Sequence, residues 1–188
     1  MARGDIRLLG LTGARWSILA SFVNVLGALG LLFGIWQYTD SVEANRASKT
    51  LDLIGEWDKE GYRDHFANLR EATSAIATSI TPGELKSLLE GGEDSDLVGQ
   101  RIAAMAFGRD AGLEAAFSEV VYFFNFLGLC IEADVCSSKT AATFFREPFS
   151  NFHDFYGPEI NRRRAEESGY ASGVGTLDAC FSGGWFDC

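Results

Sequence analysis

The residues of this chain that could do chemistry are two histidines, four cysteines and a run of three arginines. His65 and His153 have no cysteine or second histidine at the spacing of a metal site. Asp154 follows His153 directly, but neighbouring residues on a helix point about 100° apart and do not face each other. We therefore expect partly exposed histidines on amphipathic helices, without an acid–base role.

Other catalytic signatures are missing from the sequence. No serine lies in the setting of a nucleophile elbow, and the glycines of GYASGVG lack the strand–turn–helix setting of a phosphate-binding loop. The acidic loop at 91–96 alternates carboxylates, but it lacks the central glycine and distal glutamate of a calcium-binding EF-hand. We expect that the chain is not an enzyme and uses no catalytic residue, cofactor or metal.

The four cysteines indicate possible disulfides. Cys180 and Cys188 bracket the turn CFSGGWFDC, and a bond between them would close a short loop, a device suited to an oxidising compartment. Cys130 and Cys136 could form a second disulfide, and their spacing is not the CxxC of a redox motif. Cys130 could equally be an ordinary small buried hydrophobic residue.

An uncharged segment runs from Trp16 to Tyr38, WSILASFVNVLGALGLLFGIWQY, and precedes the rest of the chain. As a helix this segment would be about 33 Å long, close to the ~30 Å of a bilayer's hydrocarbon. Trp16, Trp36 and Tyr38 would serve as anchors at the two membrane interfaces, where aromatic rings prefer to lie. The segment predicts one N-terminal transmembrane helix in a lipid bilayer.

Two alternatives to the membrane span are weaker. Arg3, Arg7 and Arg15 could begin a secretory signal peptide, but the apolar run exceeds the usual length of about 7–15 residues and ends in bulky side chains. A buried core helix is the other alternative, and so long an uncharged run exceeds the usual limit for one.

Two features indicate association with another protein. On a helical wheel, Gly27, Gly30 and Gly34 share one face of the span with Asn24 at its edge, and small residues there let a second helix approach closely. We expect this face to pack against another membrane protein or against a second copy. The arginines at 162–164 end the last expected helix, where cations complement the helix dipole; binding an acidic partner is the alternative.

Charge is distributed unevenly along the chain. Residues 39–188 hold thirteen of the sixteen basic and twenty-five of the twenty-six acidic residues, a net charge of −12. Nucleic acid is therefore disfavoured as a partner. Three arginines precede the span and only Arg46 and Lys49 follow it closely, which favours a short cytoplasmic tail and an external domain.

The pattern after the span is helical throughout. Three prolines and few alternating β-branched runs exclude much sheet, and apolar spacing predicts helices at 41–60, 62–79, 82–90, 97–107, 113–131, 138–146 and 149–167. The segment at 113–131 is apolar almost all round: Phe117, Val120, Phe124 and Leu127 lie on one stripe, and Tyr122, Phe123 and Phe126 fill the other side. Its uninterrupted part is too short to span a membrane, so we expect it to be the core helix.

The fold expected from this pattern is all-α, with the transmembrane helix continuing into a soluble bundle of about five to six helices. The domains would be a basic tail at 1–15, the span at 16–38, a helical domain at 39–167 and a Gly/Ser-rich tail at 168–188. We expect that tail to be loosely ordered apart from the cysteine loop.

Two stretches, NRASKTLDLIGEWDKEGYRDHFANLREA and VVYFFNFLGLCIEADVCSSKTAATFFREPFSNFHDFYGPEINRRR, resemble DUF4760-type bacterial membrane proteins. The resemblance covers roughly residues 40 to 165 and implies an N-terminal transmembrane helix followed by an all-helical domain. The family has no assigned activity. The matching positions are Arg46, Thr50, Leu51, Trp57, Phe124, Asn125, Phe126, Pro158, Ile160 and Arg164.

Taken together, these features predict a membrane-anchored protein–protein interaction module. It would be an accessory or assembly subunit of a complex in the bacterial inner (plasma) membrane, with its domain in the periplasm. Anchoring would raise the concentration of the domain near its partners. A membrane-acting effector or sensor, in which the domain alters how spans associate, is the alternative, and an enzyme comes third.

Overall fold

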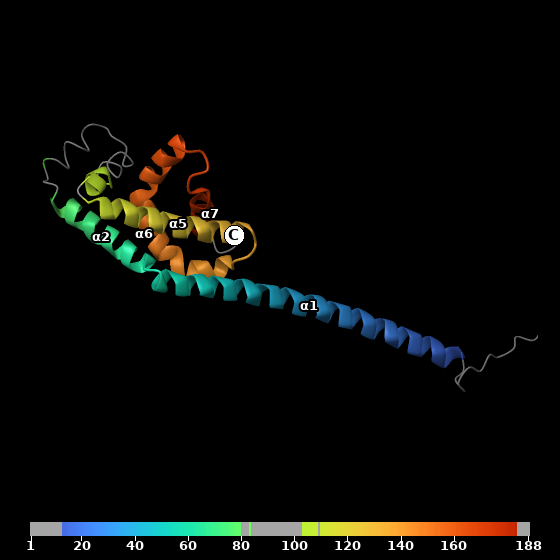
Figure 1. Cartoon of the computed structure of the whole chain (residues 1–188). Helices are drawn as coiled ribbons and strands as arrows, with labels where there is room; N and C mark the ends of the chain where they lie inside the picture. The colour runs from blue at the N-terminus through green and yellow to red at the C-terminus, as the bar shows by residue number, and fades with distance from the viewer. Residues whose placement is uncertain (1–12, 80–82, 84–102, 109, 184–188) are drawn as a thin grey trace, which may run out of the picture. The chain divides into compact units, whose positions relative to one another are not determined.

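All regular structure that the chain shows is α-helical. The computed structural model describes residues 13–79, 83, 103–108 and 110–183, although not the side chains of 13–22, 25 and 77. Its helices are α1 (Gly13–Lys59), α2 (Tyr62–Ser79), α5 (Ala111–Glu132), α6 (Ser138–Glu166) and α7 (Ser172–Ser182), and residues 103–108 are also helical (Figure 1). No strand occurs in these ranges, which confirms the all-α prediction.

The chain divides into two compact units within α1. The N-terminal unit is Met1–Asn45, and the helical unit is Arg46–Cys188. Each unit is treated below by itself. The expected helices at 82–90 and 97–107 and the acidic loop at 91–96 lie outside the described residues, except at 83 and 103–107.

Helix α5 forms the core of the helical unit, as predicted. Phe117, Val120, Phe124 and Leu127 are fully buried, and α2 and α7 pack most closely against it. Among the described residues, α5 is also the helix long and apolar enough to cross a membrane. Because eight of its residues, among them Phe117, Phe124 and Leu127, are buried inside the protein, a core helix is the better interpretation.

One expectation about α5 is wrong. Tyr122 and Phe126 do not fill a second buried side; both are exposed, and only Phe123 of that group is buried. The neighbouring helices cover α5 on the Phe117 and Phe123 sides, so the remaining face is left to solvent.

Aromatic side chains join α5 to the residues of α1 within the helical unit. The Trp57 ring lies 4.7 Å from that of Phe123, 5.5 Å from Phe124 and 5.7 Å from Phe145. Leu53 is buried beside them, whereas Leu51 is exposed. Gly61, with φ +83°, allows the turn from α1 into α2, because a residue with a side chain rarely adopts that conformation.

Helix α6 is one continuous helix, so the prediction of two helices separated near Pro148 is wrong. Pro148 and Pro158 both lie inside it. A proline removes one backbone hydrogen bond and favours a break. Here Phe145, Phe149, Phe152, Tyr156 and Ile160 continue one buried face past both prolines, and this packing keeps the helix intact.

The expectation of a loosely ordered tail is wrong for residues 172–182. These residues form α7, and Val174, Leu177 and Phe181 are buried in the core. Ala171 enters the helix at φ 51°. The prediction from Gly and Ser content failed because the absence of a side chain at Gly173 allows α7 to pack closely against α5.

Candidate functional site

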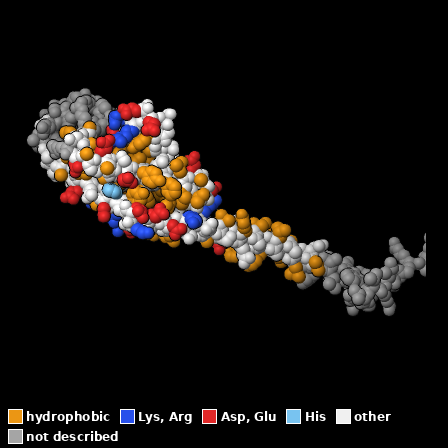
Figure 2. All heavy atoms as spheres, in the orientation of Figure 1, with side chains coloured by type: hydrophobic (Ala, Val, Ile, Leu, Met, Phe, Trp, Pro, Cys, Tyr) orange, Lys and Arg blue, Asp and Glu red, His pale blue; other side chains and the backbone are white. Residues whose placement is uncertain are grey.

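Residues 23–38 of the N-terminal unit expose a surface that is almost entirely apolar. Trp36 is 62% and Tyr38 70% exposed, and the side chain of Trp16, the third expected anchor, lies outside the described residues. Figure 2 shows hydrophobic side chains along the described part of this unit; residues 23–38 include no charged residue, and Asp40 and Glu43 follow them. Other exposed apolar residues there are Val23, Leu26, Leu29, Leu31, Leu32, Phe33 and Ile35.

The expected packing face is open in the structure. Asn24, Gly27, Gly30 and Gly34 are all exposed. A Cβ added to any of the three glycines would meet no atom within 4 Å. The face therefore has room for a second helix to approach.

A polar cluster fastens the start of the helical unit to the α5–α6 turn. Arg46 donates from Nε to the carbonyl oxygen of Asp134 at 2.8 Å, and its guanidinium lies 3.3 Å from the Asp134 carboxylate. Thr50, which is fully buried, accepts a hydrogen bond from the backbone N–H of Ser137 at 2.9 Å. The contact fixes α1 to the N-terminus of α6.

A disulfide between Cys130 and Cys136 closes the same turn. Asp134, inside the loop, has φ 60°. Cys180 is also disulfide-bonded, but Cys188 lies outside the described residues, so the pairing of Cys180 with Cys188 stays a prediction.

Backbone contact between α5 and α7 is the tightest packing in the described chain. A Cβ on Gly128 would lie 1.9 Å from the carbonyl oxygen of Gly173, and one on Gly173 would lie 2.1 Å from that of Asn125. The Asn125 side chain accepts a hydrogen bond from the Gly173 N–H at 2.8 Å, and so satisfies a donor at the start of α7. Arg164 donates to the carbonyl oxygens of Tyr170 and Ala171.

The other two arginines of the 162–164 run pair with carboxylates of the helical unit. Arg162 and Arg163 donate to the buried carboxylate of Glu159 at 2.7–2.8 Å, and Arg163 also bonds Glu114 at 3.1 Å. The Arg163 guanidinium lies 4.9 Å from the Phe117 ring centre. Burial raises the pKa of Glu159, but the hydrogen bonds from both arginines outweigh this and hold the pKa below its ordinary value.

These contacts explain the arginine run without an outside partner. Sequence reasoning missed this acceptor, although Glu159 precedes Arg162 and Arg163 by three and four positions and helical spacing alone would have indicated the pairing. It could not read the contact with Glu114, which lies far away in sequence.

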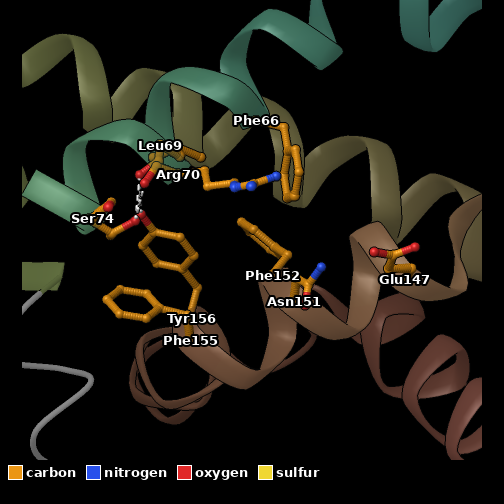
Figure 3. A pocket seen from close by; sticks show the side chains of 10 residues that line it. Phe66, Leu69, Arg70, Ser74, Glu147, Asn151, Phe152, Phe155 and Tyr156 are labelled. Atoms are coloured by element: carbon orange, nitrogen blue, oxygen red, sulfur yellow. Dashed lines mark hydrogen bonds between the residues drawn. The ribbon is translucent and has the colours of Figure 1, made fainter. Parts of the chain in front are cut away.

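A groove of about 440 Å³ lies between α2 and α6. Its apolar walls are Phe66, Leu69, Phe152, Phe155 and Tyr156, and Figure 3 shows Arg70 extending over it from α2 toward Phe66. Polar groups at its edges are Thr73, Ser74, Glu147 and Asn151.

The phenol of Tyr156 lies in the wall of the groove. Tyr156 donates a hydrogen bond to the carbonyl oxygen of Leu69, and burial raises the pKa of Tyr156 to about 12, so it stays protonated at neutral pH. The groove supports binding better than chemistry.

The two histidines lie on different helices. His153 Nδ1 lies 3.4 Å from Asp178 of α7, and its ring stacks on Phe149, so its partner is not the adjacent Asp154. His65 lies on α2. The described residues contain no group of three or more His, Cys, Asp and Glu side chains that could hold a metal.

These observations define the class: an all-α protein whose helical unit is built on one apolar core helix. The family model of a domain of unknown function, DUF4760, matches residues 24–171, and the chain belongs to that family. No curated protein and no solved structure matches the chain. Helix α7 begins at Ser172, directly after the matched region.

The positions that carried the resemblance have mostly structural roles. Arg46 and Thr50 hold the α5–α6 turn, and Asn125 and Arg164 hold the start of α7. Trp57, Phe124 and Ile160 are buried, and Pro158 lies within α6. Leu51 and Phe126 are the two whose exposure leaves their role unexplained by the fold.

Proposed function

We propose that this protein is a single-pass membrane protein whose helical unit serves protein–protein association, as an accessory or assembly subunit of a membrane complex. The observation that carries the proposal is the exposed apolar surface of residues 23–38. Each large apolar side chain left in water forgoes about 1.5–3 kcal/mol relative to burial. A bilayer around residues 16–38 would bury this surface, and the segment has the length to cross it.

The face formed by Asn24, Gly27, Gly30 and Gly34 supports association within the membrane. Its glycines leave room for close helix approach, and Asn24 would gain from a hydrogen-bonding partner in lipid. The partner on this face is another membrane protein or a second copy of the chain.

The topology we propose puts the helical unit in the periplasm of a bacterium. Arg3, Arg7 and Arg15 precede the span, which favours the N-terminus in the cytoplasm. The Cys130–Cys136 disulfide supports an oxidising compartment for the helical unit.

Carbonate extraction of membranes tests the anchor. Full-length protein should stay in the pellet, whereas a Leu29→Lys/Leu32→Lys variant should be released, because two charges would lie inside the hydrocarbon. Tyr122→Lys is the matched control, because Tyr122 is an equally exposed apolar residue on α5 and its replacement should leave the protein in the pellet. Release of the unmodified chain would remove the proposal.

Purification in mild detergent tests the association. A partner should co-purify in stoichiometric amount and be lost on Gly30→Leu or Gly34→Leu, which fill the open face. A clean monomer at native expression would count against the subunit. Host depolarisation on overexpression, relieved by the same substitutions, would favour the effector instead.

Labelling of intact cells with an impermeant maleimide tests the topology. All described cysteines are disulfide-bonded, so a periplasmic unit should label only after treatment with an impermeant reductant. Labelling that also requires opening the membrane would place the unit in the cytoplasm.

A further inference from the structure

The outer face of α5 carries an unpartnered apolar strip within the helical unit. Tyr122, Phe126 and Leu129 follow one another at four- and three-residue spacing, which places them on one face of the helix. They are 60%, 47% and 40% exposed, whereas the opposite faces of α5 are buried. We call these three residues the α5 outer strip. Helical strips of this spacing ordinarily pack against another helix.

The N-terminal end of the strip lies beside a group of carboxylates. Glu119 precedes Tyr122 by one turn. Burial raises the pKa of Tyr62, whose ring packs 5.1 Å from that of Phe123, and the nearby charges of Glu119, Glu56 and Glu60 raise it further. None of these three glutamates forms an ion pair with a residue in the described ranges.

Several basic residues of α1 and of the turn after it are paired with carboxylates, whereas Lys59, between Glu56 and Glu60 in the sequence, forms no ion pair with another described residue, so the three glutamates still outnumber it. Lys49 lies 3.9 Å from Asp52, and Arg46 bonds Asp134. At the far end of α5, the carboxylate of Glu132 accepts a hydrogen bond from Thr176. The strip is therefore apolar along its centre and bordered by negative charge.

We propose that the α5 outer strip is a docking surface for a basic amphipathic helix of another protein. The apolar side of such a helix would cover Tyr122, Phe126 and Leu129, and its Lys or Arg residues would face Glu56, Glu60 and Glu119.

Charge decides against the other occupants of the strip. A second copy would bring together two chains of net charge −10, each with the same three glutamates at the contact. An anionic lipid surface would meet the same repulsion. A basic helix instead neutralises the border while it covers the apolar centre.

This inference names the kind of partner for the interaction module proposed above and rests on that function, but it uses a separate surface from the glycine face. If the anchor proposal fails, the protein will wash off membranes while the strip still binds its probe. If the strip proposal fails, the protein will remain anchored and bind nothing there. The two failures are therefore distinguishable.

The test uses full-length protein in phosphatidylcholine nanodiscs and a fluorescent synthetic peptide of about 18 residues, long enough to form a helix. The peptide has leucines on one helical face and lysines elsewhere, and a matched peptide carries glutamates in place of the lysines. Empty nanodiscs provide the blank. We expect the lysine peptide to bind about tenfold or more tightly than the glutamate peptide, by fluorescence anisotropy.

Variants of the chain locate the binding. Phe126→Ser should weaken binding of the lysine peptide about tenfold, and Phe144→Ser, a similarly exposed phenylalanine on α6, should leave it unchanged. Glu56→Lys/Glu119→Lys should reverse the preference between the two peptides, and Asp154→Lys on α6 should not. Far-UV circular dichroism verifies that each variant remains folded.

Three results would overturn the proposal. The first is equal binding of the lysine and glutamate peptides. The second is binding that Phe126→Ser leaves unchanged. The third is a dimer of the protein that Phe126→Ser abolishes, which would make a second copy the occupant.

Discussion

The two units of this protein use the same residue types in opposite ways. In the helical unit, Trp57 is 5% exposed and packed among phenylalanines, whereas Trp36 in the N-terminal unit is mostly exposed. Gly128 touches the backbone of another helix, whereas Gly30 touches nothing beyond its own helix. The helical unit buries its tryptophan and packs its glycine against another helix. The N-terminal unit exposes residues of the same types, and they contact no other described element. The proposed membrane anchor would account for this difference, because lipid or a second helix would cover the exposed residues.

The largest expected effect sharpens the contrast between the two tryptophans. Trp57→Ala removes a buried indole that contacts Phe123, Phe124 and Phe145, and it should destabilise the helical unit by about 3–5 kcal/mol. Trp36→Ala should leave the unfolding of that unit unchanged. Denaturant unfolding of purified protein in detergent, followed by near-UV circular dichroism, measures both; comparable losses would show that the comparison is wrong.

The glycines give the next effect. Gly128→Ala places a methyl group on the Gly173 carbonyl, so α5 and α7 must separate, at a cost of about 3 kcal/mol. Gly30→Ala meets open space and should not alter unfolding of the helical unit. Thermal unfolding in detergent compares them. Wild-type behaviour of Gly128→Ala would mean that α5 and α7 do not approach as closely as described.

The buried ion cluster predicts a smaller, pH-dependent effect. Glu159→Gln removes the carboxylate that Arg162 and Arg163 share. The substitution should destabilise the helical unit by about 2 kcal/mol at neutral pH, less than for a fully buried ion pair, because Arg162 is partly exposed to water. The folded-state pKa of Glu159 is lowered, so its contribution is complete above the ordinary pKa and is lost as pH falls through the folded value.

The difference in unfolding free energy between wild type and Glu159→Gln should therefore shrink as pH falls below about 4.5. Denaturant unfolding at neutral pH and at pH about 3 measures it. Glu166→Gln, whose carboxylate is exposed beside Arg162, is the control and should cost much less. If the difference in unfolding free energy stays constant across this pH range, the ionised form of Glu159 does not contribute to stability.

Sequence periodicity predicted the elements whose apolar faces determine them. Helix α2 spans Tyr62–Ser79 as predicted, and the core role of α5 followed from its apolar length. The failures involve contacts between distant segments. The buried face of α6 continues past Pro148, against local propensity, and α7 is held by Asn125 and Gly128 from another helix. Glycine content predicts a flexible tail unless the partner that closes on it is known.

The same limit applies to the candidate surfaces. The glycine face of the N-terminal segment was readable because it lies within one helix. The α5 outer strip was not, because exposure of Tyr122 and Phe126 depends on which faces α2 and α7 cover. Hydrophobic pattern identifies a face that could be buried; only the packed structure shows which face remains free.

The smallest expected effect compares two threonines. Thr50 is buried and accepts from the Ser137 N–H, whereas Thr39 is exposed and donates to the Trp36 carbonyl within its own helix. Thr50→Val keeps the shape but leaves that N–H without its side-chain acceptor, so we expect a loss of about 1 kcal/mol. Thr39→Val should cost nothing measurable in unfolding of the helical unit. Faster amide exchange at Ser137 in Thr50→Val alone would locate the loss at the α1–α6 contact, and unchanged exchange would show that Thr50 does not hold this junction.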